Sequence, residues 1–231
     1  MKVSLLLFAA LREAVGQRTL NLEFDDGATV NDLKQRLGAE YPTVEPMLKT
    51  VVCAIDDEYV NAEAHLREGV EVALIPPVSG GAVETTPGLF RLTRDVMDPQ
   101  QLVELVRRDE AGAISLFYGI VRNHSDGRDV ERLEYEAHES MAVRKMREVA
   151  DETRQRFPEI SEIGVWHRIG VLEIGEASLL VAVSSPHRAQ AFEACHWAVD
   201  RVKEVVPVFK KEHWAGGSAW VEGHAVDEPG G

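Results

Sequence analysis

The sequence predicts an α+β protein of two domains. Its 231 residues exceed the usual size of one small domain. Short stretches with strand-like alternation mix with stretches of helical spacing on both sides of residue 81. At that point Gly80 and Gly81 are followed by the small, polar stretch AVETTPG, which is typical of a linker. We therefore predict domains at residues 1–81 and 89–231, joined by a linker at 82–88.

Composition restricts the class of protein. Hydrophobic residues make up 45% and charged residues 28% of the chain, which is the balance of a folded globular protein. The net charge is −14 and both parts are acidic, so we expect neither nucleic-acid nor membrane binding. The opening stretch is too short to span a membrane and lacks the features of a signal peptide, so we expect the cytoplasm.

Two cysteines, Cys53 and Cys195, lie far apart and in no metal-ligand spacing. We expect them to be small buried apolar side chains, with no disulfide and no metal site. No Walker loop, GxGxxG or GxSxG motif occurs, so we expect no nucleotide cofactor and no esterase chemistry.

The first domain alternates strands with two helices. The first helix should end at Gly16, and Thr29 should cap the second, whose Val30, Leu33 and Leu37 fall at helical spacing. The acidic pairs at 25–26 and 56–57 are typical of turns or loops. We predict strands at 2–8, 18–24, 51–55 and 70–75, and this order of elements is that of a β-grasp domain.

The second domain also mixes strands with helices. The alternating charges of the helix at 140–157 are best taken as a solvated face. We predict strands at 89–93, 113–122, 132–138, 163–171, 178–184 and 218–222, and helices at 98–108, 140–157 and 186–205.

The helix that begins in SSPHR has a possible anion site at its start. Ser184 or Ser185 can cap it, and Pro186 suits its first turn. A helix N-terminus offers free N–H groups and a positive dipole end, and His187 and Arg188 add to it. The alternative is an ordinary solvated cap with a surface arginine.

A lysine near the end of the same helix lies among apolar residues. Lys203 falls on a stripe formed by Phe192, Cys195, Val199, Val202 and Val206. Its side chain either reaches solvent at the helix end or is held partly desolvated. Pro207 then ends the helix, and VFKKEHW brings Lys210 and Lys211 back nearby.

Positive side chains thus recur in an acidic protein. GIVRNH places Arg122 at the end of an apolar strand, a usual position for a functional side chain. Together with the basic residues at 187, 188, 203, 210 and 211, it predicts a pocket for a small phosphorylated substrate. The alternative is a docking patch for an acidic partner.

Several short motifs occur in an order that is similar to a known family. Residues 1–81, with LFAALRE and PPVSGG, resemble the small ubiquitin-like subunit of molybdopterin synthase. Residues from about 88 to 224 resemble its large catalytic subunit, with GIVRNH, VWHRIG, SSPHRAQAF, VKEVVPVFKKE and WVEG. The resemblance implies a natural fusion of the two subunits. It also implies an α/β-hammerhead-type second domain with an antiparallel sheet.

The resemblance further implies a function and a site. The family adds two sulfur atoms to cyclic pyranopterin monophosphate to make molybdopterin, and an adenylating enzyme prepares the sulfur as a thiocarboxylate on the last glycine, here Gly81. Lys203 would act covalently or in proton transfer, and Lys210 as acid, base and charge partner. Relatives build the site across a dimer, so a homodimer through the second domain is expected. The residues implied to bind substrate are Phe117, Ile120, Val121, Arg122, His187, Arg188, Lys211 and Glu212.

Two departures from the family pattern stand out. Gly81 is followed by Ala82, so a free carboxyl requires cleavage after Gly81, and we expect that cleavage because the next residues form a soft linker. His224 stands where some relatives carry an arginine. The alternative function is a sulfur carrier whose second half is a non-catalytic docking scaffold.

Overall fold

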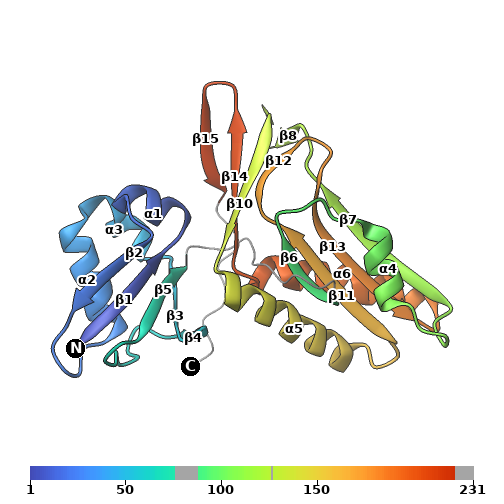
Figure 1. The fold of residues 1–231 in the computed structure, drawn as a ribbon, viewed down its shortest axis with the longest axis horizontal. Coiled ribbons are helices and arrows are strands. Elements are labelled where there is room, and N and C mark those ends of the chain that lie inside the picture. Colours follow the sequence, from blue (N-terminus) through green and yellow to red (C-terminus); the bar gives the residue numbers. More distant parts are fainter. Residues whose placement is uncertain (76–87, 126, 222–231) are drawn as a thin grey trace. The chain divides into compact units, whose positions relative to one another are not determined.

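The computed structural model describes residues 1–75, 88–125 and 127–221 (Figure 1). The chain divides into two compact units, one formed by the described residues up to Ile75 and one by those from Gly88 to Val221. Of the predicted linker at 82–88, only Gly88 belongs to the described residues. Each unit has a hydrophobic core of its own.

The first unit is a five-stranded sheet with helices against it. The strand order is β2-β1-β5-β3-β4, with β1 and β5 parallel and the other neighbours antiparallel. This is the predicted β-grasp arrangement. Its elements are β1 (Lys2–Leu7), α1 (Ala9–Val15), β2 (Thr19–Glu23), α2 (Val30–Glu40), the 3₁₀ helix η1 (Pro42–Val44), α3 (Glu45–Leu48), β3 (Val52–Ile55), β4 (Glu58–Val60) and β5 (Glu71–Ile75).

Local chemistry explains both predicted helix boundaries in this unit. Gly16 ends α1 in the left-handed conformation, with φ of 78°. Thr29 caps α2 in a capping box with Asp32, and the hydrogen bonds from Thr29 hold the pKa of the Asp32 carboxyl below its usual value. The predicted apolar face of α2, Val30, Leu33 and Leu37, is fully buried.

Three short elements of this unit were not predicted: η1, α3 and β4. The pair at 56–57 was predicted as a turn or loop, and Glu58 after it begins β4. Asp56 and Asp57 take positive φ angles of 49° and 68°, which is the geometry of a tight two-residue hairpin turn. A hairpin this short leaves little alternating sequence to recognise.

The second unit contains two four-stranded sheets. One has the order β6-β11-β13-β7 and the other β12-β10-β14-β15, and all neighbours except β6 and β11 are antiparallel. Its elements are β6 (Phe90–Thr93), α4 (Pro99–Val106), β7 (Ala113–Ile120), the two-residue strands β8 (His124–Ser125) and β9 (Arg128–Asp129), β10 (Arg132–Ala137), α5 (Glu139–Arg156), β11 (Glu162–Arg168), β12 (Gly170–Glu173), β13 (Ala177–Ser185), α6 (Arg188–Val205), β14 (Val208–Trp214) and β15 (Gly217–Val221).

Helices cover both faces of the first of these sheets (Figure 1). On one face, α5 and α6 pack on Val181 and Val183 of β13. On the other face, α4 packs on Leu180 and Ala182 of the same strand. Alternate residues of β13 therefore belong to two different cores, and every residue of the strand is buried.

The structure corrects several predictions for this unit. The single strand predicted at 163–171 is two strands, because Gly170, with φ of 85°, turns the chain into the other sheet. Strands β8, β9 and β14 were missed. Helix α5 has the predicted solvated face, and its other side buries seven side chains: Met141, Ala142, Val143, Met146, Val149, Ala150 and Thr153.

The start of α6 also differs from its prediction. The N-cap is His187, whose side chain makes no capping hydrogen bond. Ser184 and Ser185 are fully buried and end β13, where the Ser184 hydroxyl donates to the Val106 carbonyl at 2.7 Å. Strand pairing extends through both serines, and the helix begins two residues later than predicted, at Arg188.

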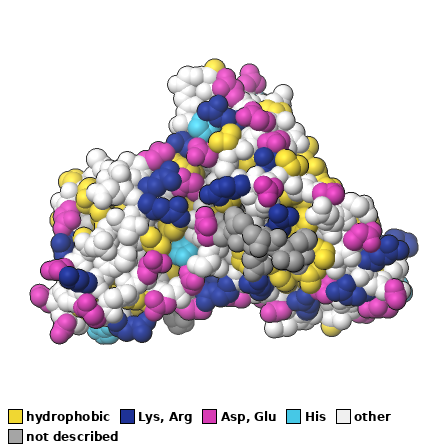
Figure 2. Space-filling view, in the orientation of Figure 1, with side chains coloured by type: hydrophobic (Ala, Val, Ile, Leu, Met, Phe, Trp, Pro, Cys, Tyr) yellow, Lys and Arg dark blue, Asp and Glu magenta, His cyan; other side chains and the backbone are white. Residues whose placement is uncertain are grey.

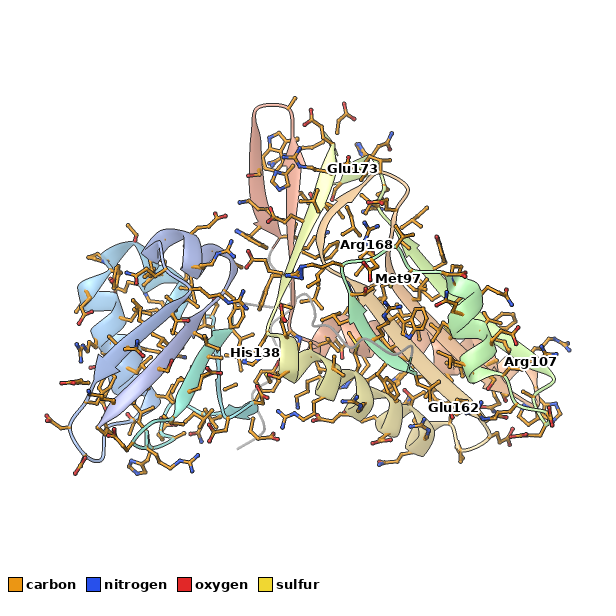
Figure 3. The ribbon with its side chains drawn as sticks, viewed as in Figure 1. Met97, Arg107, His138, Glu162, Arg168 and Glu173 are labelled. Atoms are coloured by element: carbon orange, nitrogen blue, oxygen red, sulfur yellow. The ribbon has the colours of Figure 1, made fainter. Side chains whose placement is uncertain are left out.

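Glu162, at the start of β11 (Figure 3), joins three elements. Its carboxylate lies 2.5 Å from Arg108 beyond α4 and 2.6 Å from Arg154 of α5. Burial raises the pKa of this carboxyl. The Ile163 N–H and the two guanidinium groups outweigh burial, so the pKa lies below its usual value.

We predict that Glu162→Gln destabilises the protein at pH 7 by about 1–3 kcal/mol, because two charge-assisted bonds are lost. A lowered folded-state pKa stabilises the protein above the usual glutamate pKa, and this contribution disappears as the pH falls through the folded-state value. Urea unfolding at pH 7 and at lower pH measures both effects. Glu104→Gln, which breaks an exposed pair with Arg107, is the control and should change stability little. Equal losses for the two variants would contradict this role.

Candidate active site

Lys203 lies in the last turn of α6 and its side chain extends over an aromatic ring. Its Nζ is 5.4 Å from the ring centre of Phe117 on β7. Val199 and Val202 anchor this part of the helix in the core, and Lys203 itself is exposed. Of the two predicted alternatives, the lysine thus reaches solvent at the helix end, where the ring face gives its charge a partner.

Phe192 was predicted on the buried stripe of α6, but it is 63% exposed. The buried positions begin at Ala191 and continue through Ala194, Cys195 and Ala198. Phe192 lies outside this buried face of the helix. Both cysteines are buried, as predicted.

Lys210 and Glu212 form an ion pair on one face of β14. Their side chains are two residues apart, so they project from the same side of the strand, with Nζ and Oε1 3.0 Å apart. The Glu212 side chain is only 14% exposed, and that of Lys210 is 30% exposed. Glu212, expected to contact substrate, thus also fixes the position of Lys210.

Tyr135 lies beside these candidate residues, and the sequence analysis missed it. It lies on β10 opposite Lys210 and hydrogen bonds with Ser178 of β13. Burial raises the pKa of its phenol, the Ser178 hydrogen bond opposes this, and the Glu212 carboxylate raises the pKa again. Its only sequence signal is an aromatic residue within a charged strand, which is too weak to identify a site.

A chain of contacts connects the two lysines across the two sheets. From Lys203 it passes to the Phe117 ring and along β7 to Gly119, whose carbonyl accepts a hydrogen bond from Ser178 at 3.3 Å. From Ser178 it passes to Tyr135, which lies near the Glu212 partner of Lys210. The structure therefore brings Phe117, Lys203, Lys210 and Glu212 into one connected region.

Other predicted residues lie elsewhere. Lys211 projects from the opposite face of β14, with its Nζ 5.3 Å from the ring centre of Trp220. Ile120 is 53% exposed at the end of β7, and Arg122 follows it on the surface. Val121 is buried in a core cluster, and both its N–H and its carbonyl are hydrogen bonded to the backbone. Gly81 and His224 lie outside the described residues.

His187 and Arg188 lie at the far end of α6 from Lys203. Fifteen residues separate Arg188 from Lys203, which at 1.5 Å per residue is about 22 Å along the helix. Both residues are exposed. A substrate as small as a phosphorylated pterin cannot touch both ends of α6 in one copy of the chain.

Charges of both signs are distributed over the surface. Figure 2 shows Lys and Arg side chains interspersed with Asp and Glu side chains on the face in view. Among residues 1–75, 88–125 and 127–221, no three His, Cys, Asp or Glu side chains come together to hold a metal ion. None of the helices in these ranges is both long and apolar enough to cross a membrane.

Comparisons with known proteins match both parts of the chain. The family model described as MoaE protein matches residues 92–205, and the model described as ThiS family matches residues 5–81. Molybdopterin synthase catalytic subunit 1 of Aedes aegypti is 46% identical over 136 residues, which are 58% of this chain and 88% of that protein. The catalytic subunit of Bacillus subtilis is 42% identical over 132 residues, 57% of this chain and 83% of that protein.

Solved structures agree with these matches. Molybdopterin synthase from Staphylococcus aureus is 38% identical and superposes with a TM-score of 0.57, over 59% of this chain and 98% of that chain. A molybdopterin cofactor biosynthesis protein E from Burkholderia multivorans, 28% identical, gives a TM-score of 0.52 over 63% of this chain and 97% of that chain.

The buried side chain of His167, next to Tyr135, should make the protein sensitive to acid. His167 packs edge-on against Tyr135, with ring centres 5.2 Å apart, and burial lowers its pKa from 6.5 to about 4. As the pH falls below 6.5 the unfolded chain takes up a proton that the folded chain does not. We predict that stability falls by up to about 1.4 kcal/mol per pH unit between these values.

His167→Phe should remove this part of the pH dependence, as measured by urea unfolding from pH 7 to pH 4. His196→Gln, a change at an exposed histidine of α6, is the matched control. If both variants retain the pH dependence of stability of the unmodified protein, His167 is not its source.

Proposed function

The chain belongs to the family of molybdopterin synthase catalytic subunits, and we propose that it makes molybdopterin from cyclic pyranopterin monophosphate with sulfur carried on its own N-terminal part. It is a sulfurtransferase of molybdenum cofactor biosynthesis that combines a ThiS-family carrier region with a catalytic region. We assign the carrier to residues 1–81, the linker to 82–88 and the catalytic domain to 89–231.

The connected arrangement of Lys203 and Lys210 is the observation that most supports this function. Lys203, over the Phe117 ring and open to solvent, is available for covalent or proton-transfer chemistry on the substrate. Lys210, paired with Glu212, serves as acid, base and charge partner for the developing anion. Phe117 supplies an apolar wall for the pterin.

Gly81 is the proposed sulfur carrier. The ThiS-family match ends at this residue. A glycine terminus has no side chain to obstruct a narrow channel, and its bare Cα leaves the acyl carbon open to attack. Cleavage after Gly81 must free the carboxyl, and an adenylating enzyme must then activate it for conversion to the thiocarboxylate.

A homodimer would bring the two ends of α6 together. Strand β7 is at the edge of its sheet and exposes Leu116, Tyr118 and Ile120 along one side. If two copies of β7 pair antiparallel about a twofold axis, the Ala113 end of one strand approaches the Ile120 end of the other. His187 and Arg188 lie near the Ala113 end of β7, because they follow Ser185 of β13, which pairs with Ala113. In the dimer they approach Lys203 and Arg122 of the second copy and can bind the phosphate. Lys211, on the other face of β14, would then contribute only to the surrounding positive charge.

The sulfur pathway can be tested by mass spectrometry of protein from its native cell. We expect a fragment ending at Gly81 whose mass shows one oxygen replaced by sulfur. Together with the catalytic fragment, it should form molybdopterin from the cyclic precursor. An intact chain with full activity would contradict the carrier role of Gly81.

Lys203→Ala tests the alternative of a non-catalytic docking scaffold. An exposed lysine can be removed without loss of the fold, so Tm should be unchanged while turnover is lost. The function is non-catalytic if this variant, supplied with thiocarboxylated carrier, retains turnover.

A composite site predicts complementation between inactive variants. Lys203→Ala and Arg188→Ala should each be inactive alone. When they are co-expressed, half of the dimers are mixed and each mixed dimer has one intact site, so about a quarter of the activity should return. If each site lies within one chain, the mixture stays as inactive as the single variants. Co-expression of two chains that both carry Lys203→Ala is the matched control.

A further inference from the structure

Gly119 leaves room for the aromatic ring on which Lys203 rests. It lies two residues after Phe117 on the same face of β7. A Cβ atom at Gly119 would lie 2.8 Å from Cε1 of the Phe117 ring, which is closer than such atoms approach, and 3.2 Å from Cζ, which is a tight contact. Gly119 is not among the glycines with positive φ, so the ring, and not the backbone, requires a glycine here.

The Phe117 ring in turn limits where the Lys203 ammonium lies. Lys203 is exposed, and the contact at 5.4 Å with the ring centre is its partner in the described structure. A lysine side chain has several freely rotating bonds, so a surface that attracts its charge narrows the space that Nζ samples. Movement of the ring should therefore shift the positions that the ammonium samples.

Gly119 is itself held in place from the second sheet. A β-bulge between Ala177 and Leu179 interrupts the pairing of β13 with β7 at Ser178. Ser178 donates to the Gly119 carbonyl at 3.3 Å, and Tyr135 hydrogen bonds with Ser178 from the sheet that carries Lys210. Hydrogen bonds thus connect Gly119, through Ser178 and Tyr135, to the sheet that carries Lys210.

We propose that Gly119 is a positioning residue, which places the Lys203 ammonium for reaction by seating the Phe117 ring against the strand. The kinetic consequence rests on the proposed function, whereas the placement of the ammonium does not. Gly119 touches neither substrate nor the reacting atoms in this proposal.

Gly119→Ala tests the proposal directly. The added methyl meets the far end of the Phe117 side chain, which can rotate away, so the fold should survive with unchanged Tm. A displacement of the ammonium by about 1 Å should lower kcat by about ten- to a hundredfold, with KM within about twofold. Gly88→Ala is the control, because a Cβ there meets no atom within 4 Å.

A double variant distinguishes positioning from a general structural effect. Phe117→Leu removes the ring, so adding Gly119→Ala to it should cost no further activity. Fully additive losses of kcat, or a Gly119→Ala variant as active as the unmodified chain, would overturn the proposal.

A second measurement does not depend on sulfur transfer. Trace acetylation with acetic anhydride at several pH values, followed by mass spectrometry of peptides, gives the reactivity of each lysine in the full chain. The pH profile of Lys203 should change in Gly119→Ala and in Phe117→Leu, while exposed Lys2 stays constant. An unchanged Lys203 profile refutes the positioning role even if turnover falls. A changed profile in a protein that makes no product refutes the proposed function and supports the positioning.

Discussion

The arrangement of the site depends on one strand, β13, which is buried along its whole length. Its two faces belong to different cores, and its neighbours β11 and β7 pair with it over most of their lengths. Strand β7 with Phe117, helix α6 with Lys203, and the bulge at Ser178 are all attached to it. An apolar strand with both faces covered cannot slip in register without exposing a core, so these attachments are fixed relative to one another.

The two lysines proposed to act on the substrate are held by different physical means. Lys203 extends from a helix end over a ring, a weak contact that leaves the amine accessible. Lys210 is paired with a largely buried carboxylate on a strand. One accessible amine and one fixed charge suit a reaction in which a covalent or proton-transfer step needs a neighbouring positive charge. The hydrogen bond between Ser178 and Tyr135 connects the sheet that contains β7 with the sheet that carries Lys210. It is the part of the arrangement that the sequence signals most weakly.

Local signals predicted local structure. The caps at Thr29 and Gly16 depend on a few adjacent residues, and both were predicted correctly. Strand β14 was missed because its charged residues lack apolar alternation, and its pairing with β10 is a long-range property. Gly170 lay within a stretch predicted as one strand, and only its positive φ shows that the chain changes sheet there. The basic residues 188 and 203 lie on the same helix, but fifteen residues of helix place them about 22 Å apart along its axis.

A crystal structure of the full chain with bound cyclic pyranopterin monophosphate would test the account most directly. We predict the pterin against Phe117, with its reacting carbons between the Nζ atoms of Lys203 and Lys210, and the phosphate at Arg188 of a second copy. Ligand bound at a distance from both lysines, or contacting Lys203 while Lys210 and Glu212 face away from it, would contradict the central claim that these two residues act on one substrate.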